Sequence, residues 1–131
     1  MMLKDLLLQE NCSIVASNGY VSFASGIKPI IEKLNEDLYY FKGLEVADKV
    51  VGKAAAMLFV LSGVKKVYAH VLSKAGEKIL KENNIEYEYG QLVENIINRS
   101  GDDICPMEKT VKDIDDYNEA YIALKNKFAL H

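Results

Sequence analysis

The sequence predicts an α/β domain in which a mixed sheet of about five strands lies between helices as a three-layer sandwich. Two observations carry this prediction. Asn18-Gly19 joins two short β-branched and aromatic runs, which is typical of an antiparallel hairpin. From Leu44 onward, strand patterns alternate with helical patterns, and right-handed crossovers of this kind make consecutive strands parallel.

The first half of the chain supplies the hairpin and two helices. Leu3, Leu6 and Leu7 form a helical stripe, and the hairpin follows over Ser13–Ala24. Pro29 marks the first turn of the second helix. Its buried face is predicted from apolar residues at helical spacing, namely Ile27, Ile30, Ile31, Leu34 and Leu38.

The second half predicts three strands separated by helices. The strands are Leu44–Ala47, Lys66–Leu72 and Ile85–Tyr89, and the helices are Gly52–Leu61 and Ser73–Asn83. The stretch Ala54–Leu61 is apolar on every side, so we expect it to lie between the sheet and another layer or a partner subunit. After a polar loop over Asn98–Ile104, helical spacing continues from Met107 to Phe128.

Length and composition predict a single domain over residues 1–131. Half of the residues are hydrophobic and 27% are charged, which is a globular composition. No apolar run approaches the roughly 20 residues of a membrane span, and no secretory signal is evident, so we expect a cytoplasmic protein without a membrane partner. Cys12 and Cys105 are expected to stay reduced.

Charge argues against nucleic acid as a partner, because the formal net charge is −3 and nucleic-acid-binding modules usually have a basic excess. The charge is uneven, however. Residues 28–81 contain ten Lys and six acidic residues, whereas residues 102–119 contain seven acidic residues and two Lys. A local basic surface that binds a small anion is therefore compatible with the composition.

The order helix, hairpin, helix, then alternating strands and helices is similar to the cytidine-deaminase-like fold. Within that superfamily the chain resembles a small uncharacterised prokaryotic family of unknown function. The resemblance rests on three strings: Gly26–Pro29, Asp48–Ala55, and Arg99-Ser100-Gly101 followed by Cys105–Glu108.

The resemblance implies a site for catalytic zinc, which needs a His or Cys, two further Cys and a proton-transferring Glu. In that fold these residues open the helix after the hairpin and the helix after the next strand. Here the same places hold Gly26-Ile27-Lys28 and Asp48–Gly52, without thiol, imidazole or glutamate. We therefore expect no metal, no other cofactor and no zinc-dependent deamination.

Two helix starts would still point into one crevice, where backbone N–H groups attract an anion. Lys28, Lys49 and Lys53 would add positive charge there, and Gly26 and Gly52 would allow a close approach of the backbone. The segment is not a P-loop, because its glycine spacing differs. The hypothesis is a pocket for a nucleotide or a phosphorylated metabolite.

A structural interpretation of the same residues stays open. Gly26 and Gly52 would then serve tight turns, and the Lys side chains would point to water. Asp48 would cap a helix, or alternatively act as a general base or a partner of Lys49 or Lys53.

Cys105 begins a predicted helix in which Pro106 takes the first position and Glu108 the third. Cys105 then stands where a capping residue belongs. A helix start also favours thiolate, and Arg99 would add positive charge and is a further ligand-binding candidate. Catalysis would assign Cys105 as nucleophile and Asp48 or Glu108 as acid or base.

His70 lies near the carboxyl end of a predicted strand, where ligand-facing side chains gather in α/β folds, although a lone His in an apolar strand is more often a structural residue. Three functions thus remain. The first is a non-zinc module that binds a small anion, the second an enzyme using Cys105, and the third a structural or regulatory subunit of a homo-oligomer.

Overall fold

The computed structural model describes residues 2–98 and 100–129 of the chain. Within these residues five strands and six helices alternate in an α/β arrangement. The strands are β1 (Ile14–Ala16), β2 (Val21–Ser22), β3 (Glu45–Val51), β4 (Lys66–Ser73) and β5 (Glu86–Val93). The helices are α1 (Leu3–Gln9), α2 (Lys28–Glu36), α3 (Lys53–Ser62), α4 (Lys74–Glu82), α5 (Pro106–Val111) and α6 (Tyr117–Ala129).

The strands form one mixed sheet in the order β2-β1-β3-β4-β5. β1 pairs antiparallel with both β2 and β3, whereas β3, β4 and β5 are parallel. The predicted hairpin is confirmed. Gly19 has a φ of 95°, which glycine adopts without strain, and the Asn18 side chain accepts a hydrogen bond of 3.0 Å from the Tyr20 N–H.

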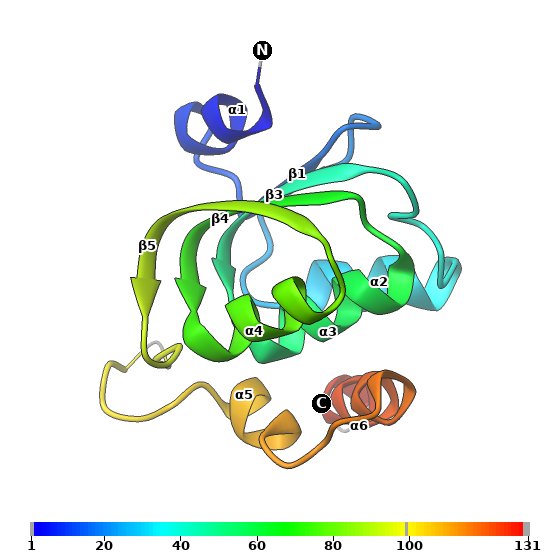
Figure 1. Cartoon of the computed structure of the whole chain (residues 1–131), viewed down its shortest axis with the longest axis vertical. Coiled ribbons are helices and arrows are strands. Elements are labelled where there is room, and N and C mark those ends of the chain that lie inside the picture. Colours follow the sequence, from blue (N-terminus) through cyan, green and yellow to red (C-terminus); the bar gives the residue numbers. More distant parts are fainter. Residues whose placement is uncertain (1, 99, 130–131) are drawn as a thin grey trace.

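Helices cover the two faces of the sheet unequally (Figure 1). α1 lies alone on one face, where it contacts β1 and β3. α2, α3 and α4 lie on the other face, and α5 and α6 form a further layer beyond them. The expected three-layer sandwich is therefore present, with a fourth, partial layer on its helical side.

The apolar helix α3 is buried from all sides by its own chain. Residues 54–59 are at most 1% exposed. α2 and α4 flank α3, and α5 and α6 pack on it with residues such as Val111 and Leu124, which are both fully buried. The outer layer that the sequence required is thus supplied by the C-terminal segment of the same chain.

Two strands, β3 and β5, continue four residues beyond their predicted ends. β3 continues through Asp48 to Val51, because Asp48 is paired with Ile14 on one side and Ala69 on the other, and a central strand continues while both neighbours supply partners. β5 extends to Val93 past Gly90, where a Cβ atom would lie 2.8 Å from the His70 carbonyl oxygen. Glycine allows this close approach of the edge strand.

In the part of the chain that the structure covers, no helix has the length and apolar character needed to cross a membrane.

Candidate functional site

The candidate site is a cleft between α4 and the segment that leads into α5, with a volume of about 600 Å³. This volume lies in the range of small-molecule sites. The first turn of α3 closes one part of it through Lys53. Its lining combines four lysines, three carboxylates and a few apolar or amide side chains, namely Lys53, Lys78, Lys109, Lys112, Glu82, Glu108, Asp115, Ala75, Ile79, Ile104 and Asn95.

The four lysines of the cleft differ in how they are paired. Lys78 lies 3.9 Å from the Glu82 carboxylate, and Lys109 forms an ion pair with Asp103. Lys53 Nζ instead donates a hydrogen bond of 3.1 Å to the main-chain oxygen of Lys112. Within residues 2–98 and 100–129, neither Lys53 nor Lys112 forms an ion pair with a carboxylate. These two ammonium groups are the ones that an incoming anion can engage.

Glu108 closes the N-terminus of α3 from 55 residues further along the chain. Its Oε1 accepts a hydrogen bond of 2.7 Å from the Lys53 N–H, and its Oε2 accepts one of 2.8 Å from the Ala54 N–H. Burial raises the pKa of the Glu108 carboxyl, and the two N–H donors together with the nearby Lys53 charge oppose that rise. The carboxylate satisfies two N–H groups that the helix itself leaves unpaired.

Gly52 makes room for this carboxylate. A Cβ atom at position 52 would lie 2.0 Å from Glu108 Oε1 and 2.8 Å from a side-chain carbon of Ile96. The sequence analysis expected a ligand to approach the backbone closely at Gly52, whereas the group that approaches it in the structure is the chain's own Glu108. Glu108, at the third position of α5, thus bonds to the start of another helix, α3.

The residues expected to form a crevice with Lys53 lie elsewhere. Gly26 is exposed with a φ of +71°, and no atom lies within 4 Å of where its Cβ would be, so it serves a turn. Lys28 is exposed at the first position of α2. The Lys49 ammonium bonds to Asn11, which follows α1. None of the three lines the α4–α5 cleft, and Arg99 lies outside the described residues.

Asp48 is a buried residue of the central strand β3 and does not cap a helix. Its sheet neighbours Ile14 and Ala69 both belong to the main core cluster, so the Asp48 side chain points to the face covered by α2, α3 and α4. Burial raises the pKa of the Asp48 carboxyl to about 8, although the backbone N–H groups of Val50 and Lys49 lower it. Asp48 lines neither of the two cavities described in this section.

Cys105 stands at the N-cap of α5, as predicted, and is half-buried without a capping hydrogen bond from its side chain. Among the residues that the structure describes, no hydrogen bond joins any two of Cys105, Asp48 and Glu108. The three proposed catalytic residues are thus not assembled as a nucleophile with its acid and base. Cys12 is fully buried beside α1.

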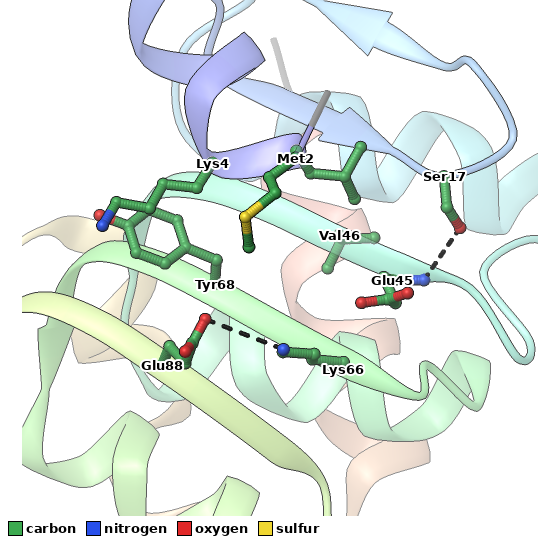
Figure 2. A pocket seen from close by; sticks show the side chains of 9 residues that line it. Met2, Lys4, Ser17, Glu45, Val46, Lys66, Tyr68 and Glu88 are labelled. Carbon is green, nitrogen blue, oxygen red and sulfur yellow. Dashed lines mark hydrogen bonds and ion pairs between the residues drawn. The ribbon is translucent and has the colours of Figure 1, made fainter.

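A second hollow of about 340 Å³ lies on the opposite face of the sheet, beside α1 (Figure 2). Its floor is formed by Val46, Tyr68 and the Lys66–Glu88 pair, whose charged atoms are 3.8 Å apart. The Lys4 ammonium lies over the Tyr68 ring, 5.4 Å from its centroid. The charges that line this hollow are thus largely matched with groups of the protein itself.

His70 is exposed within β4, three residues before its end, and the Tyr68 hydroxyl lies 3.2 Å from its Nδ1. Neither cavity is lined by His70. Over residues 2–98 and 100–129, no three His, Cys, Asp or Glu side chains lie close enough to hold a metal ion together.

The family described as TM1506, a domain of unknown function (DUF1893), matches residues 2–128. The chain belongs to the DUF1893 family. A solved structure of a DUF1893 family protein from Thermotoga maritima is similar to it, with a TM-score of 0.86 and 30% sequence identity. The similarity covers 95% of this chain and 86% of that one. Among curated proteins, none matches the chain.

In this DUF1893 chain, sequence reasoning identified Lys53 and Glu108 as site residues but missed Lys78, Lys109 and Lys112. Lys109 and Lys112 share one side of α5 because they are three residues apart, which was the only local signal. Their meeting with Lys53 and Lys78 depends on how the C-terminal layer packs, and no local pattern encodes that.

Proposed function

We propose that this DUF1893 protein binds a small anionic metabolite, such as a nucleotide or another phosphorylated compound, in the α4–α5 cleft. One observation carries the proposal: lysines from three helices converge on one cavity, and two of them, Lys53 and Lys112, have no carboxylate partner within the described residues. A cavity of this size with unpaired ammonium groups is suited to holding a phosphate or carboxylate.

The carboxylates of the cleft do not cancel this charge. Glu108 is bonded to the start of α3, whose dipole offsets its negative charge, and Glu82 is paired with Lys78. Of the carboxylates that line the cleft, Asp115 is then the one left to offset the two charges of Lys53 and Lys112, which leaves a surplus of positive charge. The local excess of positive charge therefore falls where the proposed ligand would bind.

We further propose that the scaffold is a cytidine-deaminase-like fold that works without zinc. The antiparallel order β2-β1-β3, followed by parallel β4 and β5, supports this relation. The helix starts that would supply zinc ligands in that fold carry Gly26, Lys28 and Gly52 instead. Elemental analysis of purified protein should find no stoichiometric zinc, and a value near one zinc per chain would overturn this part of the proposal.

The binding proposal is tested with a thermal-shift screen of nucleotides, sugar phosphates and inorganic phosphate. A ligand present at about 100 times its Kd adds roughly 2.7 kcal/mol to the free energy of unfolding. Affinity for each compound that scores is then measured by calorimetry in the parent, Lys53→Ala and Lys112→Ala proteins. Two matched controls are Lys65→Ala and Lys28→Ala, both at exposed lysines outside the cleft.

We expect Lys53→Ala and Lys112→Ala to weaken binding about tenfold or more, because each removes a charge-assisted contact of roughly 1.5–3 kcal/mol. Binding should also weaken as salt is raised. If Lys112→Ala binds as well as Lys65→Ala, the cleft is not the anion site. If Lys28→Ala alone weakens binding, the ligand lies at the start of α2, as the sequence suggested.

A further inference from the structure

Resting on the proposed function, we infer that the ligand of the α4–α5 cleft is a phosphate monoester that carries a flat aromatic ring, as an aryl phosphate or a nucleoside monophosphate does. Three features of the cleft favour this class over inorganic phosphate or a phosphorylated sugar. They are the number of unpaired charges, the apolar walls and the cavity volume.

The charge of the ligand follows from the pairing of the lysines. Lys53 and Lys112 are the two ammonium groups of the cleft without a carboxylate partner in residues 2–98 and 100–129. The Lys53–Lys112 hydrogen bond of 3.1 Å also keeps the Lys53 ammonium beside the last turn of α5. A phosphate monoester has a charge of about −1.5 to −2 near neutral pH, so its oxygens can engage both ammonium groups. A triphosphate would place additional negative charge beside Glu82 and Asp115.

The walls of the cleft match a flat apolar group. Ala75 and Ile79 line it from α4, and Ile104 lines it from the segment before α5. Ile104 is held by a β-bridge to Ile97, so this wall does not depend on a free loop end. A sugar phosphate has hydroxyl groups on most of its surface, and these would lose their hydrogen bonds to water against such side chains.

The volume of the cleft beyond the phosphate, and the Asn95 amide beside it, agree with an aromatic ring in the ligand. Phosphate alone would occupy a small part of the roughly 600 Å³ cleft. Asn95 is exposed two residues after the end of β5 and lines the cleft, and its amide both donates and accepts hydrogen bonds. A heterocycle that presents a neighbouring donor and acceptor pairs with such an amide in two places.

The test compares four compounds by calorimetry at one salt concentration: adenosine monophosphate, phenyl phosphate, ribose 5-phosphate and inorganic phosphate. We expect the two aromatic compounds, adenosine monophosphate and phenyl phosphate, to bind at least about tenfold more tightly than ribose 5-phosphate, because only they bury an aromatic ring. Lys112→Ala should weaken the binding of every phosphate compound that the parent protein binds. Asn95→Ala should weaken the binding of adenosine monophosphate several-fold and leave the affinity for phenyl phosphate unchanged. Asn118→Ala, at an exposed position of α6, is its matched control.

The outcomes separate the inference from the proposed function. If ribose 5-phosphate binds as tightly as both aromatic compounds and Lys112→Ala weakens its binding, the cleft is an anion site but the inference about the aromatic ring is wrong. If all four compounds fail to bind, or bind equally well to parent and Lys112→Ala protein, both are overturned. If phenyl phosphate binds tightly and Asn95→Ala affects neither ring compound, the ring is supported and the amide contact is refuted.

Discussion

Replacing Asp48 with Asn should make the protein more stable at pH 8 and leave its stability almost unchanged at pH 4. The pKa of the Asp48 carboxyl rises from 3.8 to about 8 because the group is buried among apolar neighbours. Between these two pH values the folded chain keeps a proton that the unfolded chain releases. Stability must therefore fall as the pH rises through this window, and it should level off above pH 8.

The size of the effect follows from the difference in pKa. One pKa unit corresponds to about 1.36 kcal/mol, so a difference of about four units amounts to a loss on the order of 5 kcal/mol between pH 4 and pH 8. An Asn side chain cannot ionise, and its oxygen can accept the 3.3 Å hydrogen bond that Val50 N–H donates to Asp48 Oδ1. The amide of the Asp48→Asn variant thus imitates the neutral carboxyl at every pH.

The assay is urea unfolding of the parent and Asp48→Asn proteins at pH 4, 5, 6, 7 and 8, with Asp113→Asn at an exposed position as control. The other titrating groups cancel in the difference between the two unfolding free energies. That difference should grow steadily with pH for Asp48→Asn and stay near zero for Asp113→Asn. A difference that does not depend on pH, or that shrinks as pH rises, would refute the reasoning.

Three further predictions concern local contacts. Glu108→Ala should lower the free energy of unfolding by about 2–4 kcal/mol in urea titrations, because two helix N–H groups lose a charged acceptor. A loss smaller than the error of the titration would mean that water replaces the carboxylate. Cys105 should react with a thiol reagent faster than Cys12, because Cys105 is half-buried and Cys12 is 0% exposed; equal rates would contradict this difference in access. Gly90→Ala should lower the free energy of unfolding by about 1–3 kcal/mol, because the new Cβ would lie 2.8 Å from the His70 carbonyl oxygen. An unchanged urea midpoint would show that β5 can shift to make room.

The sheet could be predicted from the sequence because its signals are local. Asn18-Gly19 specifies a hairpin whatever surrounds it, and alternation of strand and helix from Leu44 onward leads to parallel pairing. The predicted end of β3 was wrong because it depends on pairing with distant parts of the chain. Asp48 and Lys49 look like the start of a helix, but the ladders of two neighbouring strands extend the strand through them.

The candidate site was predicted only in part, because its residues meet through the packing of the C-terminal layer. Lys53 was identified from its place at a helix start, and Glu108 from its place in a short motif. That Glu108 would reach the start of α3, and that Lys112 would come beside Lys53, depends on contacts between residues 55 and 59 positions apart in sequence. Such contacts have no periodic pattern that a single sequence can reveal.

The burial of α3 by α5 and α6 has a consequence for how the chain folds during synthesis. A nascent chain that has been made as far as β5 already contains every strand of the described sheet, yet the outer side of the apolar helix α3 still lacks Val111 and Leu124. Until those residues leave the ribosome, that side is an exposed apolar surface of the kind that favours aggregation. A chain truncated between β5 and α5 should therefore be insoluble although it keeps all five of these strands.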